Sequence, residues 1–422
     1  MKILLCNVSK KYETRAHDYL GLFYLAGALE AAGFEPLVFH GKPEDLIEQV
    51  KQNQPDAVGF SCDFDNVSLI ADLSRKIKKG WEIPVIVGGP QSIGLDGQFL
   101  KESQADYILR GEAEVSLPLL LKAVLKEEGE LSEISGLAMI RDGVFTVTPP
   151  EIIKDLDALP LPAYHASLHI DHAYGKLIFT GRGCPYQCAY CAPSPGKQQV
   201  RLRSIPLVLE EIKLNLENNP ELKYIIIMDD AFTLSRERIE EFCRGMREIR
   251  QDRDLVWYCE CHVGRIKNWM DILPTMIDAG LVRLQIGIES GDQQVIDQYN
   301  KHVKIDDIVE FVTYAAACGL TQIATNFIVG GPAESPGATA TLIKTLIDRA
   351  PGIIDIITGF LRAYPGTEIM DNPEKFNLVL HDQSGRLSGD DYPFVTPVGC
   401  SQDQIMNMRQ ELNKVIRRSM QQ

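Results

Sequence analysis

The chain has 422 residues, of which 45% are hydrophobic, and its formal net charge is −15 at pH 7. That length and apolar share predict two to three domains with proper hydrophobic cores. The negative charge argues against a nucleic-acid substrate, because binding nucleic acid relies on Lys and Arg to neutralise phosphates. No apolar run is long enough to span a membrane, and the apolar start of the chain is too short for a signal peptide. We therefore expect a cytoplasmic protein.

Residues 1–126 alternate strand and helix patterns, as in a parallel sheet covered by helices. The strands predicted are 2–7, 35–40, 57–61, 84–88 and 107–110, and helices include 20–32, 43–53 and 66–79. The pattern predicts a doubly wound, Rossmann-like sheet whose ligand lies outside the carboxyl ends of the strands. At those ends Ser61 offers a hydroxyl, and Gly88 and Gly89 allow close approach to the backbone, although a Gly-Gly pair also serves as a plain turn.

Residues 127–174 read as a connector. Strand patterns at 137–140 and 144–148 flank an Asp-Gly pair and predict a hairpin, and a proline-rich stretch predicts a stiff, extended path. Three histidines follow, His165, His169 and His172. They could ligate a metal, but histidines at the surface or facing a substrate are the commoner case.

From residue 175 to about 370 the alternation resumes. The strands predicted are 177–181, 224–229, 256–260, 283–289, 322–329 and 353–361, with helices at 207–217, 236–249, 269–279, 305–317 and 339–348. Repeated strand-helix units without a change of direction predict an open, partial (β/α)6 barrel with its chemistry at the carboxyl ends of the strands. The remaining segment, 371–422, holds a helix that begins near Ser401, where Ser401 and Gln404 match a capping box. Its apolar stripe predicts packing on the barrel.

Residues 181–191, here called the cysteine loop, place Cys184, Cys188 and Cys191 in a CxxxCxxC pattern. A four-iron four-sulfur cube takes one protein ligand per iron, so three cysteines leave one iron open to a small chelating ligand. A structural zinc site is the alternative, but it takes four ligands, normally as two close pairs. The nearest cysteines that could supply a fourth ligand, Cys243, Cys259 and Cys261, are distant from this loop in sequence. The pattern therefore favours a 4Fe-4S cluster.

The cysteine loop resembles the cluster loop of the radical S-adenosylmethionine (radical SAM) superfamily. In that family the open iron chelates the amino and carboxylate groups of SAM, and the reduced cluster splits SAM to release a 5′-deoxyadenosyl radical. The resemblance implies an external electron donor such as flavodoxin or ferredoxin. It also implies that Tyr190, just before the third cysteine, lies near the adenine of SAM.

Further residues match the same family. Glu289 and Ser290 belong to a Gly-Ile-Glu-Ser-Gly run that resembles the fourth strand of this class, and Lys301 matches the family's lysine downstream, although a solvated helix cap is the alternative for it. Glu260 and Arg265 flank a strand end where family members contact the carboxylate or ribose of SAM.

Asp229 ends a strongly apolar strand. An acid there could accept a hydrogen bond from the amine of SAM, or it could cap the next helix. The family often has Gly-Gly-Glu at this point and this chain has Met-Asp-Asp, so both readings stay open.

A doubly wound domain before the cysteine loop resembles the cobalamin-binding class of radical SAM enzymes. The match rests on residues 20–26, Ser61, residues 88–90 and residues 111–114. It implies a corrinoid at the carboxyl edge of the sheet, with Ser61, Gly88 and Gly89 beside it. The chain lacks the DxHxxG loop whose histidine ligates cobalt in many cobalamin domains, which leaves open a domain that has kept its fold and lost its cofactor.

The function that the resemblance implies first is methylation of an unactivated carbon of a small molecule. In that reaction the 5′-deoxyadenosyl radical removes a substrate hydrogen, the substrate radical takes the methyl group carried by cobalamin, and a second SAM replaces it. A radical rearrangement, dehydrogenation, deoxygenation or cyclisation, with or without cobalamin, is the second hypothesis. A non-catalytic corrinoid or iron-sulfur module that senses light or redox state is the third.

Overall fold

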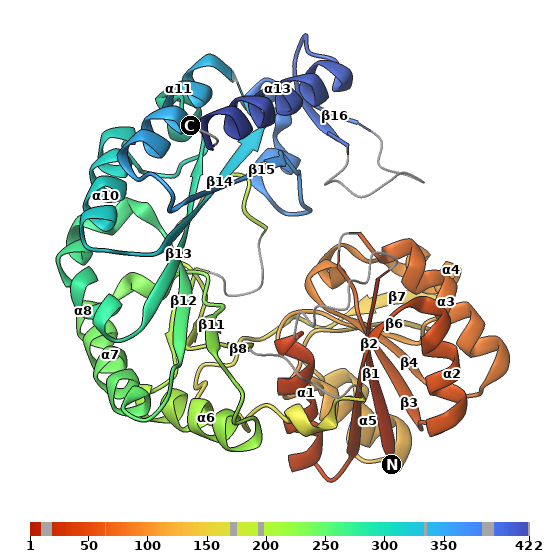
Figure 1. Cartoon of the computed structure of the whole chain (residues 1–422). Coiled ribbons are helices and arrows are strands. Elements are labelled where there is room, and N and C mark those ends of the chain that lie inside the picture. The colour runs from red at the N-terminus through yellow and green to blue at the C-terminus, as the bar shows by residue number, and fades with distance from the viewer. Residues whose placement is uncertain are drawn as a thin grey trace. The chain divides into compact units, whose positions relative to one another are not determined.

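The chain divides into two compact units in the computed structural model (Figure 1). The first unit runs from Met1 to Ala173, and the second begins at Tyr174 and holds the rest of the chain but for a few residues. The structure describes residues 1–9, 19–63, 65–168, 175–192, 198–332, 336–381 and 392–420. Within these residues no helix has both the length and the apolar character needed to cross a bilayer.

The first unit is built on one sheet in the order β2-β1-β3-β4-β5-β6-β7. The first five strands are parallel: β1 Lys2–Val8, β2 Glu35–Gly41, β3 Ala57–Ser61, β4 Val85–Gly88 and β5 Tyr107–Leu109. The order 2-1-3-4-5 is that of a doubly wound sheet, in which the winding reverses between β1 and β3. The predicted fold of this unit is therefore confirmed, and its ligand edge is the carboxyl edge near that reversal.

Helices cover both faces of this sheet. Alternate residues of β1 show the two layers: Ile3 and Leu5 pack with α1 (Leu20–Ala31) and α5 (Ser116–Lys126). Leu4 and Cys6 pack on the opposite face with α2, α3 and α4, which span Pro43–Asn53, Val67–Gly80 and Gly97–Ser103. Because both faces are buried, the strands are apolar runs without the alternation of a half-exposed sheet.

The predicted hairpin is present as β6 (Leu137–Arg141) and β7 (Val144–Val147). Asp142 and Gly143 form its turn with φ of +52° and +79°, the left-handed geometry that a two-residue hairpin turn requires. Strand β6 also pairs antiparallel with β5, so the hairpin extends the first sheet, which its local pattern did not predict. Of the three histidines, His165 lies 2.6 Å from Glu30, and His169 and His172 lie outside the described residues.

The second unit contains a six-stranded sheet in the order β15-β14-β13-β12-β11-β8. Its strands are β8 Gly175–Ile178, β11 Tyr224–Ile227, β12 Val256–Cys261, β13 Leu281–Glu289, β14 Gln322–Val329 and β15 Ile354–Phe360. All neighbours are parallel. The order follows the chain in one direction, and among the described strands no pairing joins β8 to β15. This is the predicted open, partial barrel.

The helices of this unit lie on one face of the sheet (Figure 1). They are α6 Ile205–Asn218, α7 Arg236–Arg250, α8 Leu273–Asp278, α10 Ile305–Ala317 and α11 Pro336–Arg349, and they share one hydrophobic core with the strands. The other face keeps exposed apolar side chains, Tyr224 and Met228 on or beside β11 and Ile357 on β15. A short helix, α9 (Gln293–Gln298), follows β13 and was not predicted.

The last helix, α13 (Gln402–Met420), begins with the predicted capping box. The amide of Gln404 donates to Ser401 Oγ at 3.2 Å, and the Gln404 side chain accepts from the amide of Ser401 at 2.7 Å. Ile405, Leu412 and Ile416 are buried against the barrel core, as predicted. Before it lie α12 (Glu368–Asp371) and an antiparallel pair, β16 (Leu378–Leu380) and β17 (Val395–Pro397).

Candidate functional site

The cysteine loop leaves the barrel sheet after β8, which ends at Ile178, earlier than predicted. Its first residues form β9 (Gly181–Arg182), which pairs antiparallel with β10 (Arg201–Leu202) and so brings the two ends of the excursion together. Cys184 is buried, Cys188 is half-buried and Cys191 is exposed, and none of the three forms a disulfide. The loop therefore presents three sulfurs over a range of depths.

These sulfurs fit a cube better than a single ion. In the described part of the chain, no three His, Cys, Asp or Glu side chains converge on one point closely enough to hold one metal ion. A zinc ion needs its ligands around a single centre. In a 4Fe-4S cube each cysteine binds a different iron, so the three sulfurs need not meet at one point. The donor set of three thiols on one loop fits a cube with one open iron.

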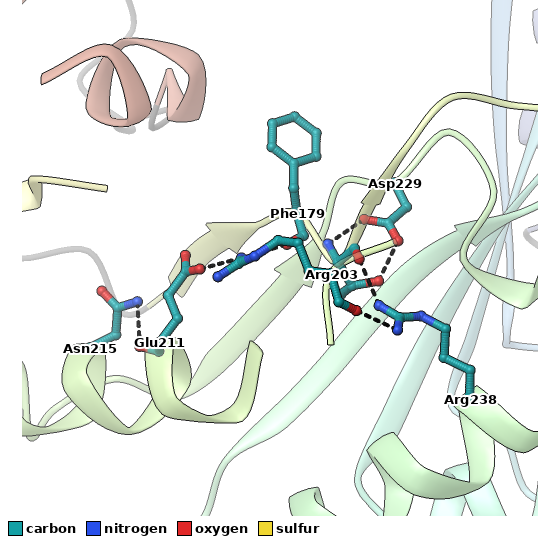
Figure 2. Close-up of polar contacts among 7 residues, drawn as sticks. Phe179, Arg203, Glu211, Asn215, Asp229 and Arg238 are labelled. Carbon is teal, nitrogen blue, oxygen red and sulfur yellow. Dashed lines mark hydrogen bonds and ion pairs between the residues drawn. The ribbon is translucent and has the colours of Figure 1, made fainter. Parts of the chain in front are cut away.

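The base of the cysteine loop is closed by backbone carbonyls and one guanidinium (Figure 2). Arg238, on α7, donates to the carbonyl oxygens of Thr180 and Arg203, each at 2.6 Å, and these residues flank the loop on its two sides. The amide of Arg203 also donates to the carbonyl of Thr180 at 2.9 Å. The two ends of the loop are thus fixed to each other and to α7 by the protein alone.

A buried ion pair lies beside this closure (Figure 2). The side chains of Arg203 and Glu211 are 6% and 2% exposed, and their charged atoms lie 2.5 Å apart. Arg203 also donates to the carbonyl of Phe179 at 2.8 Å. Buried charges are tolerated only when paired and hydrogen-bonded, so these contacts hold the strand before the loop against α6.

Asp229 uses both carboxylate oxygens within the fold. Oδ1 accepts the amide of Thr180 at 2.6 Å, and Oδ2 accepts the Thr180 hydroxyl at 2.5 Å. Burial raises the pKa of Asp229 to about 6, against the opposing effect of these hydrogen bonds. Asp229 therefore ties the end of β11 to the residue that precedes the loop. Ser235, and not Asp229, caps α7. A contact of Asp229 with SAM stays a prediction.

The tip of the loop meets two residues that the sequence had suggested separately. The Tyr190 hydroxyl donates to Glu289 Oε1 at 2.9 Å, and Lys301 Nζ lies 2.7 Å from the same oxygen and 3.0 Å from the Tyr190 hydroxyl. We call Tyr190, Glu289 and Lys301 the tip triad. Lys301 is buried, so the alternative of a solvated cap is wrong. Gly287 provides the space that the Glu289 carboxylate occupies, because a Cβ on residue 287 would lie 2.2 Å from Glu289 Oε1.

The chain around Lys301 also holds the loop through its backbone. The amide of Ala189 donates to the carbonyl of Tyr299 at 2.9 Å, and Asn300 Nδ2 donates to the carbonyl of Gln187 at 2.9 Å. Asn300 has φ of +55°, a conformation that Asn adopts more readily than most residues. The sequence analysis missed Tyr299 and Asn300, for which the only local signal is an Asn that follows a short helix.

On another side of the loop, His262 stacks on Tyr186 with 3.5 Å between ring centroids. Burial lowers the pKa of His262 to about 3, and its Nδ1 accepts the amide of Gly264 at 3.0 Å, so Nε2 carries the proton of a neutral ring. Arg265 is exposed, and with Tyr186 and five other residues in or beside the loop it lines a surface pocket of about 360 Å³. The pocket is large enough for part of a small ligand.

Two other predicted residues have different surroundings. Glu260, on β12, reaches solvent, yet desolvation and then the nearby Asp230 raise its pKa. Ser290 is fully buried, and its hydroxyl accepts the amide of Asp292 at 3.1 Å and lies 3.5 Å from the Thr339 hydroxyl. Glu260 remains available to a ligand at the rim, whereas Ser290 shapes the turn after β13. Their contacts with SAM stay predictions.

In the first unit, Ser61, Gly88 and Gly89 lie at the carboxyl ends of β3 and β4. Gly89 has φ of +90°, and a Cβ on it would lie 2.6 Å from the amide nitrogen of Cys62, so the fold itself requires glycine there. At the same edge, the side-chain oxygens of Asn7 and Gln91 are buried without a hydrogen-bond partner in the described structure.

Buried polar atoms are normally paired, so these two acceptors fit a ligand that brings amide donors, as the periphery of a corrinoid does. The sequence places both residues at the carboxyl ends of predicted strands, but neither was assigned a contact with the ligand.

Two family models match the chain. Residues 178–346 match the Radical SAM superfamily, and residues 8–121 match the B12 binding domain. The two matches confirm the cofactors expected from the sequence, which are a 4Fe-4S cluster with SAM for the second unit and cobalamin for the first.

Curated relatives cover most of the chain. It is 27% identical over 381 residues to an uncharacterised methyltransferase of Pyrococcus horikoshii, a match that covers 86% of this chain and 79% of the relative. It is 26% identical over 395 residues to the anaerobic magnesium-protoporphyrin IX monomethyl ester cyclase of Rubrivivax gelatinosus, covering 89% and 68%.

Solved structures share the fold. The radical SAM methyltransferase TsrM from Kitasatospora setae, with cobalamin and a [4Fe-4S] cluster bound, superposes with a TM-score of 0.75 at 17% identity, over 98% of this chain and 89% of that one. The cobalamin-dependent radical SAM enzyme OxsB superposes with a TM-score of 0.70 at 19% identity, over 88% of this chain but 55% of that one. At these identities the likeness is one of fold.

Proposed function

Because the chain belongs to the radical SAM superfamily and also carries a B12 binding domain, we propose that it is a methyltransferase acting on an unactivated carbon of a small molecule. The observation that carries the proposal is the pairing of the two domains in one chain. A relative that matches 86% of the chain is named a methyltransferase, which supports the proposal at 27% identity.

In this proposal the reduced cluster supplies the electron that splits SAM into methionine and a 5′-deoxyadenosyl radical, and cobalamin supplies the methyl group. Cys184, Cys188 and Cys191 hold the cluster, and the closed base of the loop keeps their spacing fixed. Glu260 and Arg265 lie exposed near the loop, with charges that suit the amine and carboxylate of SAM.

The uncovered face of the barrel sheet suits a small molecule with an apolar part. Tyr224, Met228 and Ile357 are 37%, 39% and 42% exposed there, which is unusual for large apolar side chains of a sheet. An apolar face also keeps water away from a carbon radical. The cluster needs one electron from outside the chain, and we propose a small cytoplasmic carrier such as flavodoxin or ferredoxin as its source.

A second candidate is a radical reaction without methyl transfer. The Rubrivivax gelatinosus relative is named a cyclase, and it matches 89% of the chain at nearly the same identity as the methyltransferase. A cyclisation would use the cysteine loop in the same way and would differ in what becomes of the substrate radical.

The two candidates separate in a single anaerobic experiment. The protein is reconstituted with iron, sulfide and cobalamin, reduced, and incubated with SAM, and 5′-deoxyadenosine and S-adenosylhomocysteine are measured by mass spectrometry. Methyl transfer predicts both products, with S-adenosylhomocysteine reaching the amount of bound cobalamin before any substrate is added. Formation of 5′-deoxyadenosine without S-adenosylhomocysteine would remove methyl transfer and favour the second candidate. The Cys188→Ala variant is the control for radical formation.

A further inference from the structure

The tip triad contains a buried ion pair whose presence stability does not explain. The side chains of Lys301 and Glu289 are 5% and 8% exposed, and their charged atoms lie 2.7 Å apart. A buried ion pair is seldom more stable than apolar side chains of the same volume, because both charges lose their hydration. Glu289 also has φ of +71°, which is unfavourable for a residue with a side chain. We therefore look for a functional reason for this buried ion pair.

The pair lies against the part of the loop that carries the cysteines. Tyr190, which bonds to both charges, stands between Cys188 and Cys191 in the sequence. The Lys301 ammonium lies 5.7 Å from the centre of the Tyr190 ring. Tyr299 and Asn300, directly before Lys301, bond to the two residues that flank Cys188, which are Ala189 and Gln187. The charges are thus fixed against the segment of the loop that carries Cys188 and Cys191, by contacts on several sides.

Fixed charges in a poorly hydrated site act strongly on a redox centre. A neighbouring cation stabilises the more negative, reduced cluster and raises its reduction potential, whereas a neighbouring anion lowers it. The triad places one charge of each sign beside the loop, and the hydrogen bonds of Tyr190 keep both in place. Removing either charge therefore leaves the other uncompensated at the same site.

We propose that Lys301 and Glu289, linked by Tyr190, are positioning residues that set the reduction potential of the cluster on the cysteine loop. Lys301 raises the potential at which the cluster accepts one electron from the external donor, and Glu289 limits that increase. The proposal concerns the cluster and holds for either candidate reaction, so its failure and the failure of methyl transfer are distinguishable.

The test is a redox titration of the reconstituted protein, followed by electron paramagnetic resonance without SAM or substrate. We expect Lys301→Met to shift the midpoint potential to a more negative value and Glu289→Gln to shift it to a more positive one. The double variant should lie between the two. A purely structural role would not give shifts of opposite sign. Iron content and Mössbauer spectra establish that each variant holds an intact cube.

Lys267→Met is the matched control. Lys267 also pairs with a carboxylate, Asp307, at 2.6 Å, but its side chain is 57% exposed, so its removal should leave the potential unchanged. Shifts of the same sign in both triad variants, or no shift with an intact cube, would overturn the proposal. Glu289→Gln is nearly isosteric and is therefore expected to assemble a cluster. If Lys301→Met does not assemble one, Glu289→Gln tests the proposal by itself. A midpoint potential that does not rise in Glu289→Gln would then overturn the proposal.

Discussion

The base and the tip of the cysteine loop both contain buried charged side chains, but these side chains bind different partners. At the base, Arg238, Arg203 and Asp229 all bond to backbone amides or carbonyls on either side of the loop, and Arg203 and Asp229 also bond to the side chains of Glu211 and Thr180. At the tip, Glu289 and Lys301 bond to each other and to the side chain of Tyr190. The difference suggests a rule for this site: charged side chains that bond to the backbone on either side of the loop hold the loop in place, and charged side chains that bond to a side chain between the cysteines act on the cluster.

The largest effect is expected from the cysteines themselves. Cys188→Ala should abolish cluster binding and the formation of 5′-deoxyadenosine, because one iron loses its only protein ligand. The base of the loop does not involve Cys188, so the thermal unfolding of the apo-protein should stay unchanged.

Iron content, Mössbauer spectra and calorimetry measure these quantities. Cys400→Ala is the control, since Cys400 is a half-buried cysteine outside the loop, and it should retain the cluster. A Cys188→Ala protein that keeps an intact cube would refute the assignment of the tip.

The next largest effect concerns the ion pair at the base. Arg203→Met removes the guanidinium that lies 2.5 Å from the buried Glu211 carboxylate, which should reduce the free energy of unfolding by about 3–5 kcal/mol. The double variant Arg203→Met/Glu211→Leu should recover most of this loss. Urea unfolding, followed by tryptophan fluorescence, measures both.

The exposed pair of Arg236 and Asp271 supplies the control. Arg236→Met should change the unfolding midpoint little, because exposed ion pairs contribute little to stability. If Arg203→Met lowers the free energy of unfolding no more than Arg236→Met does, the ion pair of Arg203 and Glu211 does not stabilise the base of the loop.

Asp229 gives a pH-dependent prediction of intermediate size. Its pKa is raised from 3.8 to about 6, so the native state keeps a proton that the unfolded state has lost, and wild-type stability falls as the pH rises between those values. Asn does not titrate, so Asp229→Asn should gain about 3 kcal/mol relative to wild type between pH 4 and pH 7. Chemical unfolding at a series of pH values measures this gain. A difference that stays constant with pH would show that Asp229 is not protonated in the fold.

The smallest effect is expected at Asn300. Asn300→Ala loses the hydrogen bond to the carbonyl of Gln187 and puts Ala in a left-handed conformation, for a local cost of about 1–2 kcal/mol. Hydrogen exchange of the Ala189 amide should become faster. Asn300→Gly loses the same hydrogen bond but accepts the backbone conformation, so its exchange should lie between those of wild type and Asn300→Ala. Equal exchange in all three proteins would mean that the segment does not hold the tip.

The sequence predicted what depends on local patterns. The parallel strands of the first sheet appear as apolar runs because both of their faces are buried, and the capping box at Ser401 needs only residues three apart. The cysteine loop is identified by the spacing of its three cysteines within eight residues, from Cys184 to Cys191. These signals need no knowledge of distant contacts.

Partners far apart in sequence were not predictable in this way. Tyr190 and Glu289 are 99 residues apart and Tyr190 and Lys301 are 111 apart, so nothing local indicates that they meet. Likewise, the hairpin pattern of β6 and β7 predicts their mutual pairing but not the pairing of β6 with β5. The apolar strand before Asp229 shows where that carboxylate lies along the chain, but not that Thr180 would use both of its oxygens.

The central claim is that a cube held by Cys184, Cys188 and Cys191 keeps one iron open for SAM. Electron–nuclear double resonance of the reduced protein, with SAM labelled with ¹⁵N in the amino group and ¹³C in the carboxylate, tests it most directly. The account predicts hyperfine coupling of both labels to the cluster. A reduced cube that shows no coupling to either label at saturating SAM would contradict it.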